Sequence, residues 1–402
     1  MKIFFVHNYY GSSAPSGENM VFEAEMALLR RRGHEVREFV RSSDGIRSRG
    51  AFGTIQGAIA TPWNPWAAAA VRQEVNWFKP DVVHVHNTFP MISPAVFHSI
   101  GHRAARVLTL HNYRLFCPAA IPMRHGRVCT ECLDSKSAWP SLRHGCYRGS
   151  RLATLPLAAS VMLHRRIGTW TGQVDAFIAL TGFQRKMLVA AGLPDGLVHV
   201  KPNFYAGNPE PAPWAFRGNY ALFAGRLSDE KGVADLVRAW LIWGEAAPEL
   251  RILGDGPLRD TLQSMAAQAP GVQIRFLGQL ASTDAEQQIA GARLLVVPSV
   301  CFEGFPMVIR EAFAHGTPVA VSNIGPLPSI VRDGSSGVIF QPHDSESLCR
   351  EVRAAWSAPE ALEQLGNAGL AEFTTLYNED TNYEKLMNIY TAALVKRSGR
   401  TT

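Results

Sequence analysis

The sequence lacks any apolar run of about 20 residues, the length that a membrane-spanning helix needs. Its first residues, MKIFFVH, are too short in their apolar part for a secretion signal and have no small-residue cleavage site. We therefore expect a cytoplasmic protein whose chain opens on a β-strand. The 402 residues predict two or three domains, and a hydrophobic content of 47% is ample for their cores.

Acidic residues are scarce in the first half of the chain. Residues 1–205 hold 24 Lys and Arg against 12 Asp and Glu, a net charge of +12. The remaining residues hold 16 against 22, a net charge of −6, and the two values sum to the +6 of the whole chain. This asymmetry predicts an anionic partner for the first half, such as a membrane surface, a lipid-linked phosphate or a nucleic acid. The alternative is chance decoration of the surface.

Cysteine is also scarce, but four of the six cysteines fall close together. Cys117, Cys129, Cys132 and Cys146 follow the spacing C-x11-C-x2-C-x13-C. In a cytoplasmic protein this pattern favours zinc over disulfides, with free thiols as the remaining alternative. Four thiolates leave no open metal position, so a zinc ion here would be structural, and His125 and His144 are substitute ligands. The metal would hold together an insertion, about residues 112–150, that is too polar to form its own core.

Apolar segments that alternate with amphipathic ones predict an α/β fold with doubly wound parallel sheets. In the first series, we expect strands at 2–6, 35–40, 81–86, 106–110, 174–179 and 197–200. The helices of this series are expected at 19–32, 67–78 and about 150–170, whereas 41–66 have no clear period. A linker with four prolines, 202–218, precedes a second series with strands at 220–224, 249–253, 273–277, 294–297 and 318–322.

These patterns divide the chain into an N-terminal domain, 1–203, and a C-terminal domain, 204–381. A last helix within 382–402 follows the second sheet and is expected to pack back on the N-terminal domain. Two such domains would face one another across a cleft, with ligands at the carboxyl ends of the strands.

The stretch 301–312 carries the strongest chemical signal. It begins as a loop after a buried strand, and Pro306 suits the first position of a helix. Free N–H groups at this helix start would form an anion site beside the carboxylates of Glu303 and Glu311. Such a site suits a ligand with both phosphate and hydroxyl groups. The plainer interpretation is an ordinary strand–loop–helix unit with two solvated glutamates.

Two further loops follow strands of the second series. In the first, Arg226 and Lys231 are cations that can bind a phosphate, unless they only form ion pairs with Asp229 and Glu230. The second, 253–258, is a glycine-rich turn that could admit a base or a ribose close to its backbone. Alone, this turn is a weak signal.

Taken in order, these motifs resemble the retaining glycosyltransferases of family 4 (group 1 glycosyltransferases), which have the GT-B fold of two Rossmann-like domains. The likeness extends over nearly the whole chain, and the pair Glu303 and Glu311, with seven residues between them, is the family's signature. The insert resembles a subset of the family, with HNYRL at 111–115 and CYRGS at 146–150. The other matching segments are RGHEV at 32–36, 81–86, KPN at 201–203, Gly225-Arg226, Lys231-Gly232 and EGFP at 303–306.

The resemblance implies a role for each matching residue. Arg226 and Lys231 would hold the donor diphosphate in place of a metal ion, so no catalytic metal is expected. Glu311 would bind the ribose and Glu303 the donor sugar, while the backbone of Gly304, Phe305, Met307 and Val308 would contact sugar and phosphate. Gly17 would let the backbone approach the phosphate, although this loop has Ser16-Gly17 where many relatives have Gly-Gly. His111 would touch the donor sugar, unless it is structural; His84 is expected to be packed in the sheet interior, and His86 is a weak candidate.

The implied activity is retaining transfer of a hexosyl group from a UDP- or GDP-linked sugar to a lipid-linked or saccharide acceptor. Its setting would be cell-surface polysaccharide or glycolipid biosynthesis. The alternatives are a sugar-nucleotide epimerase of the same fold, an inactive donor-binding scaffold and a zinc-containing nucleic-acid-binding module. Nucleic acid is not expected, because the aromatic residues form no stacking platform and no recognition helix follows the cysteines.

The basic first half fits a peripheral enzyme on the cytoplasmic face of a membrane. The helix at about 151–170 has apolar residues on one side and Arg151, Arg165 and Arg166 at its ends. It would contact an anionic membrane, unless it only packs on the first sheet. The cysteine insert begins just after His111, so we expect it to shape the acceptor site.

Overall fold

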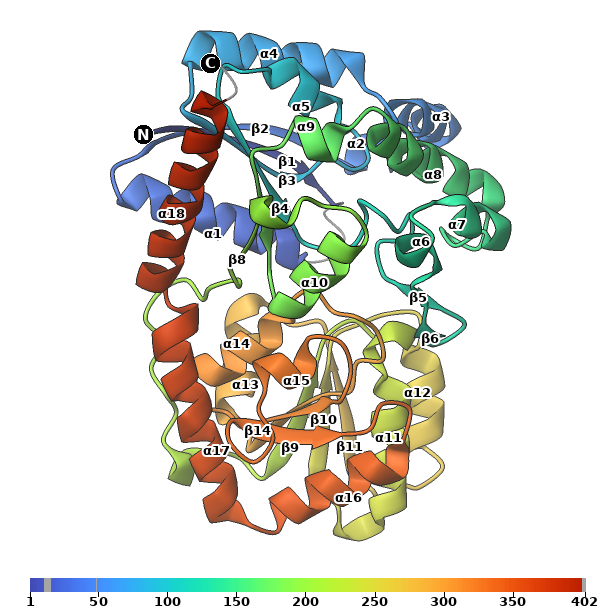
Figure 1. Cartoon of the computed structure of the whole chain (residues 1–402). Coiled ribbons are helices and arrows are strands. Elements are labelled where there is room, and N and C mark those ends of the chain that lie inside the picture. Colours follow the sequence, from blue (N-terminus) through green and yellow to red (C-terminus); the bar gives the residue numbers. More distant parts are fainter. Residues whose placement is uncertain (11–15, 48, 400–402) are drawn as a thin grey trace. The chain divides into compact units, whose positions relative to one another are not determined.

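The chain forms two compact units in this computed structural model, which describes residues 1–10, 16–47 and 49–399. The first unit contains Met1–Pro122, Cys129–Asn203 and Glu379–Thr402, and the second contains Met123–Val128 and Phe204–Asn378. Each unit is built around a six-stranded parallel sheet, whereas six strands were predicted for the first unit and five for the second (Figure 1).

The sheet of the first unit has the order β2-β1-β3-β4-β7-β8, and every neighbouring pair is parallel. Every residue of β3 and β4 is buried, as the near-continuous apolar runs of the sequence require in a sheet covered on both faces. The strands are β1 (Lys2–Tyr9), β2 (Glu35–Ser42), β3 (Val82–Asn87), β4 (Ala105–Leu110), β7 (Ala176–Ala179) and β8 (Val198–Val200).

Helices cover both faces of this sheet. The first helix, α1 (Gly17–Arg31), and the last, α18 (Glu379–Ser398), share one core with the sheet, to which Phe5, Phe22 and Leu386 contribute. On the other face, the ring of Phe78 at the end of α4 (Pro65–Phe78) lies 6.4 Å from that of Phe4. Other helices of this unit are α5 (Ala95–Ile100), α7 (Trp139–His144), α8 (Arg151–Arg166) and α10 (Gly182–Ala190).

The prediction of irregular structure over residues 41–66 was wrong. This segment contains α2 (Asp44–Arg47) and α3 (Gly50–Ala60) before α4 begins. Gly and Ala dominate α3, and its large apolar residues Ile55 and Ile59 are 59% and 66% exposed. Among the side chains of α3 that the structure describes, there is therefore no buried stripe of large residues from which a period could be read. In the later helix α8, Pro156 lies inside the helix.

The insert after β4 contains short elements only. They are the two-stranded hairpin of β5 (Met123–Arg124) and β6 (Arg127–Val128), then α6 (Glu131–Asp134) and α7. Between α8 and β7 lies the short helix α9 (Thr169–Gly172).

The second unit contains a parallel sheet of order β11-β10-β9-β12-β13-β14. The strands β9 to β13 lie within one residue of the predicted bounds, whereas the sequence did not predict β14 (Gly337–Phe340). A Cβ on Gly337 would lie 2.2 Å from the carbonyl oxygen of Val319, so this short strand has a glycine where it approaches its neighbour. The other strands are β9 (Tyr220–Ala224), β10 (Glu249–Leu253), β11 (Ile274–Gly278), β12 (Leu294–Val297) and β13 (Val319–Ser322).

Trp240 is fully buried in the core of the second unit, and its indole N–H donates to the carbonyl oxygen of Pro248 at 2.8 Å. It lies on α11, the helix that follows β9 and its 3-10 turn. The helices of this unit are α11 (Val233–Trp243), α12 (Arg259–Ala266), α13 (Ser282–Gly291), α14 (Met307–Ala314), α15 (Leu327–Ile330), α16 (Ser345–Trp356) and α17 (Pro359–Glu372).

Each sheet reverses its strand order at one point, and ligands of open α/β sheets bind at the carboxyl ends of the strands there. The reversal lies between β9 and β12 in the second unit and between β1 and β3 in the first. In the part of the chain that the structure describes, no helix combines the length and apolarity needed to cross a membrane.

The place of α18 in the core of the first unit predicts unequal effects of two substitutions on that helix. Leu386→Ala removes a fully buried side chain and should lower the free energy of unfolding by about 2–5 kcal/mol. Val395→Ala, at a position that is 69% exposed, should change it by less than about 0.5 kcal/mol. Urea unfolding followed by tryptophan fluorescence measures both, and equal stabilities of the two variants would contradict this packing.

Candidate functional site

In the second unit, charged side chains meet where the sheet reverses. Lys231 ends a 3-10 turn (Asp229–Lys231) that follows β9, and Glu303 lies in the loop that follows β12. Nζ of Lys231 is 2.6 Å from Oε1 of Glu303, and the hydroxyl of Ser299 donates to the same oxygen at 2.7 Å. The side chains of Lys231 and Glu303 keep 28% and 12% of their surface exposed, so both remain within reach of a ligand.

The pairing fixes the charge of the lysine. Burial opposes the charged form, but the carboxylate of Glu303 outweighs it, so the pKa of Lys231 lies above its usual value. Lys231 is therefore a cation at neutral pH. Arg226, the other predicted phosphate ligand, lies exposed in the loop between β9 and this turn.

Glycines bring the backbones of these loops into direct contact. Gly232 has φ +64°, and a Cβ there would lie 1.9 Å from the carbonyl oxygen of Pro298. Gly254 has φ +121°, and its Cβ would lie 2.0 Å from the carbonyl oxygen of Gly225. The glycine-rich turn at 253–258, predicted as a contact for a base or ribose, thus packs against the Arg226 loop.

Helix α14 follows Glu303 and presents Glu311 on its second turn. Pro306 is the N-cap of this helix, one residue before the first helical position at which it was expected. Burial raises the pKa of the Glu311 carboxyl, while Arg310, whose guanidinium is 3.7 Å away, opposes the shift.

The other predicted donor ligands lie around the start of this helix. Gly304 is partly exposed in the preceding loop, and Met307 and Val308 open the helix. Phe305 is buried, with its ring 5.4 Å from that of Tyr377, so only its backbone is left for a ligand.

In the first unit, the predicted loop residues lie near the ends of β1 and β4. Gly17 was expected in a loop, but it is the exposed first residue of α1. Residues 11–15 of the preceding loop, which include Gly11, lie outside the described residues. His111 follows directly after β4 and is partly exposed.

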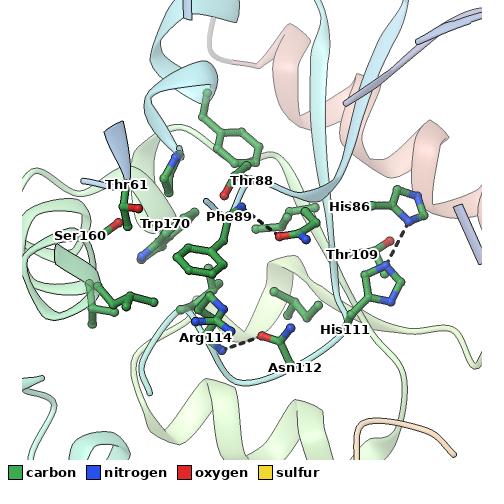
Figure 2. A pocket seen from close by; sticks show the side chains of 18 residues that line it. Thr61, His86, Thr88, Phe89, Thr109, His111, Asn112, Arg114, Ser160 and Trp170 are labelled. Carbon is green, nitrogen blue, oxygen red and sulfur yellow. Dashed lines mark hydrogen bonds between the residues drawn. The ribbon is translucent and has the colours of Figure 1, made fainter. Parts of the chain in front are cut away.

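His111 lines a pocket within the first unit (Figure 2). The pocket encloses about 720 Å³, including its open mouth. His86, Asn112 and Arg114 contribute polar groups, and the guanidinium of Arg114 lies over the ring of Phe89 at 4.2 Å. The apolar part of the lining includes Phe89, Pro94, Phe97, Leu108, Leu110, Leu115, Leu157, Val161 and Trp170.

Behind His111 lies a buried network of titratable side chains, most of which the sequence interpretation missed. Nε2 of His111 is 3.0 Å from Nδ1 of His86, and Nε2 of His86 is 3.4 Å from Oε2 of Glu25 (Figure 2 shows the two histidines). The other oxygen of Glu25 accepts a hydrogen bond from Lys201 at 2.5 Å. The histidines at alternate positions of the apolar strand β3 and the Lys in KPN at 201–203 were the available signals for this network.

Burial and charge set the protonation of the network. Burial alone would raise the pKa of Glu25, but Lys201 and the two neighbouring histidines hold it well below its usual value. Burial lowers the pKa of His111 well below its usual value, with contributions from His86 and His7. Glu25 is therefore ionised and His111 neutral near pH 7.

His84 is fully buried, as predicted, and both of its ring nitrogens have partners. Nδ1 is 2.8 Å from the hydroxyl of Tyr390, and Nε2 is 2.8 Å from that of Thr109. Among the described residues, Glu25, His84 and His86 form the only group of three whose ligand atoms all lie within 4.8 Å of one another. A cation there would compete with the ammonium of Lys201, so the group does not fit a metal site.

No disulfide joins the four clustered cysteines, which lie in one neighbourhood of the insert. Burial raises the pKa of Cys117 to about 12, and the nearby thiols of Cys132 and Cys146 contribute. Burial likewise raises the pKa of Cys132 to about 11, with contributions from Cys146 and Cys129. The chemistry of four thiols fits zinc, although the sulfur atoms are not gathered to the 4.8 Å spacing described above. His144 is partnered by Glu131, at 3.5 Å.

Comparison with known families finds a match in each half of the chain. Residues 17–205 match the family model described as Glycosyltransferase Family 4, and residues 209–371 match the one described as Glycosyl transferases group 1. These segments contain the site residues of both units.

Curated relatives match parts of the chain. D-inositol 3-phosphate glycosyltransferase of Streptomyces griseus is 33% identical over 186 residues, which are 43% of this chain and 39% of that protein. The sulfoquinovosyl transferase SQD2 of Arabidopsis thaliana is 25% identical over 335 residues, 80% of this chain and 58% of that protein. The chain thus spans between about two fifths and three fifths of the length of these relatives.

Solved structures match nearly the whole chain. Anabaena HepE in complex with UDP is 18% identical, with a TM-score of 0.66 over 98% of this chain and 100% of that one. Sucrose-phosphate synthase from Thermosynechococcus elongatus is 16% identical, with a TM-score of 0.69 over 98% and 99%. These likenesses establish the GT-B fold. The two family models together match residues 17–205 and 209–371, which is most of the chain, and these matches show that the chain belongs to the group 1 glycosyltransferases.

Proposed function

We propose that the chain is a retaining glycosyltransferase that moves a hexosyl group from a nucleotide-sugar to a lipid-linked or saccharide acceptor in cell-surface polysaccharide or glycolipid biosynthesis. The observation that carries this proposal is the contact of Lys231 with Glu303 at the reversal point of the second sheet, directly before α14. It combines a cation for phosphate with a carboxylate for hydroxyl groups at the place where such sheets bind ligands.

In this proposal the second unit holds the donor. Lys231 and Arg226 bind the diphosphate and stabilise the negative charge that develops on it as the sugar leaves. Glu303 accepts hydrogen bonds from hydroxyls of the sugar, and Glu311 from those of the ribose. The start of α14 adds backbone N–H groups and the positive end of its dipole.

His111 contacts the transferred sugar in this proposal, and the pocket beside it takes part of the acceptor. That pocket combines hydrogen-bonding groups with an apolar lining, which suits an acceptor with both a hydroxyl and an apolar portion. UDP is the first nucleotide to test, because HepE binds UDP and UDP-glucose in its solved complexes.

The donor site predicts a selective response to nucleotides. A ligand at about 100 times its dissociation constant stabilises a protein by about 2.7 kcal/mol, which would raise the melting temperature of this unit by roughly 5–10 °C. We expect UDP or another nucleoside diphosphate to do so, and Lys231→Ala and Glu311→Ala to abolish the shift in differential scanning fluorimetry. Arg275→Ala, at an exposed cation on β11, is the matched control and should keep the shift. A shift that survives in both site variants would refute the site.

A second part of the proposal is that the first unit binds an anionic membrane surface. Large apolar side chains are exposed on two contacting helices, α3 and α8, to which Ile55, Ile59, Leu152 and Leu155 belong. Figure 1 shows these helices beside α7, which exposes Trp139. Arg151 and Arg166 at the two ends of α8 are also exposed. Exposed apolar residues flanked by cations are typical of a surface that lies on lipid.

Arg165 has a different role from its two neighbours. Its guanidinium donates to the carbonyl oxygen of Ala191 at 2.7 Å and lies over the ring of Phe116 at 5.2 Å. Its charge therefore serves the fold, and its substitution would not test membrane binding.

The membrane surface predicts that Arg151→Glu/Arg166→Glu lowers binding to vesicles rich in anionic lipid by about 10- to 30-fold, since each cation near such a surface contributes about 1 kcal/mol. Co-sedimentation with liposomes measures the change. Arg275→Glu in the second unit is the control for charge alone, and the nucleotide-induced thermal shift should be unchanged in the double variant. Equal sedimentation of wild type and double variant would remove the membrane assignment.

We also propose that the cysteine insert holds a structural zinc ion through Cys117, Cys129, Cys132 and Cys146. Their mutual proximity and the absence of a disulfide among these described cysteines support it. The ion would fix a segment whose helices have only four and six residues.

Zinc predicts about one equivalent of metal in the purified protein by plasma mass spectrometry. Cys129→Ser/Cys132→Ser should remove it and lower the melting temperature, because metal binding contributes directly to folding. Cys349→Ser, in α16, should leave the metal content unchanged. Wild-type protein purified without chelators and free of zinc would rule out the site.

A further inference from the structure

His111, which lines the pocket, is held by a series of buried side chains. With His111, the connected residues come from four parts of the first unit. His111 follows β4, His86 lies on β3, Glu25 on α1 and Lys201 just after β8. Their side chains connect in that order through contacts of 3.0, 3.4 and 2.5 Å. His86, Glu25 and Lys201 are at most 3% exposed, so water does not replace these contacts.

The charge of Glu25 determines which atom donates and which accepts in each hydrogen bond between Glu25, His86 and His111. Glu25 is ionised beside the ammonium of Lys201 and can only accept hydrogen bonds. Nε2 of His86 and Oε2 of Glu25 are both buried, and neither has another hydrogen-bond partner in the described part of the chain. A proton on Nε2 of His86 satisfies both atoms, whereas a lone pair there would face a carboxylate.

The next contact then has one favourable arrangement. With its proton on Nε2, His86 has a lone pair on Nδ1 that accepts from Nε2–H of His111. The lone pair of His111 is thereby left on Nδ1. Among the described residues, no group hydrogen-bonds to this Nδ1.

We propose that Glu25, His86 and Lys201 are positioning residues that fix His111 as the Nε2–H tautomer and present its Nδ1 as an acceptor for a hydroxyl of the bound sugar or acceptor. This inference rests on the proposed transferase function and extends it from the pocket to groups behind it. Lys201 neutralises the buried carboxylate, Glu25 orients His86, and His86 orients the ring that meets substrate. A fixed ring also loses less freedom when the substrate binds.

Tyr390 provides a matched control, because it lies next to the network but is not one of its four connected residues. His84 lies on the same strand as His86, and its Nδ1 contacts the hydroxyl of Tyr390. Tyr390→Phe removes a buried hydrogen bond next to the network but leaves the four connected groups in place. It should lower stability while leaving kcat unchanged.

Two double variants test the proposal, each replacing the ion pair as a unit so that no lone charge is buried. Glu25→Leu/Lys201→Met removes the acceptor for His86, and Glu25→Gln/Lys201→Met keeps a carbonyl oxygen there. We expect the first to lower kcat by about 10- to 100-fold with little change in KM for the nucleotide-sugar, and the second to restore most of the loss. A merely structural role would make both variants lose activity together, in step with stability.

Long-range ¹H–¹⁵N spectra of protein labelled at histidine provide a readout that needs no activity, with His111→Asn identifying the signal. The wild type should show His111 protonated at Nε2, and Glu25→Leu/Lys201→Met should lose this signature. A wild-type His111 protonated at Nδ1, or a signature unchanged in that variant, would overturn the proposal. A wild type without transferase activity would refute the proposed function, while the spectra would still decide the tautomer.

Discussion

Direct contact between backbones is the constraint on which the second unit depends. At the carboxyl edge of its sheet, the turn after β9 lies against the loop after β12 and against the turn after β10, with no room for a side chain at Gly232 or Gly254. The amide of Val300 also donates to the carbonyl oxygen of Glu230 at 3.0 Å. Because the loops are fixed to one another by their main chains, Lys231 and Glu303 can meet without either being held by a long flexible segment.

The first unit organises its site in another way, through buried charge. An isolated carboxylate in the core would be costly, and Glu25 is tolerated because Lys201 lies beside it. Replacing such a pair with apolar residues often leaves stability unchanged or improves it, so stability alone gives little reason for its presence. A role in orienting His86 and His111 explains why polar groups occupy the space between α1 and the sheet.

Much of the fold could be predicted from the sequence, because strands such as β9 and β12 are short apolar runs bounded by glycine and proline. The helix α3 could not, since its exposed isoleucines and small residues give no periodic pattern. In the site, Lys231 and Glu303 are 72 positions apart, and their motifs were recognised although their contact could not be computed from spacing. Glu25 and Lys201 were missed as a pair, because 176 positions separate them and each looks like an ordinary surface charge in a sequence.

The return of α18 to the first unit affects how the protein is made. Leu386, Ile389, Tyr390 and Ala393 complete a core whose other buried members lie among the first 178 residues. A ribosome must therefore synthesise Phe204–Asn378 before that core can close, which takes roughly 10–35 s at bacterial to eukaryotic rates of synthesis. During this interval, the nascent first unit exposes the apolar groove of α1 and the sheet. The first unit can therefore complete its core only after the second unit has been translated, although most of its own sequence is made first.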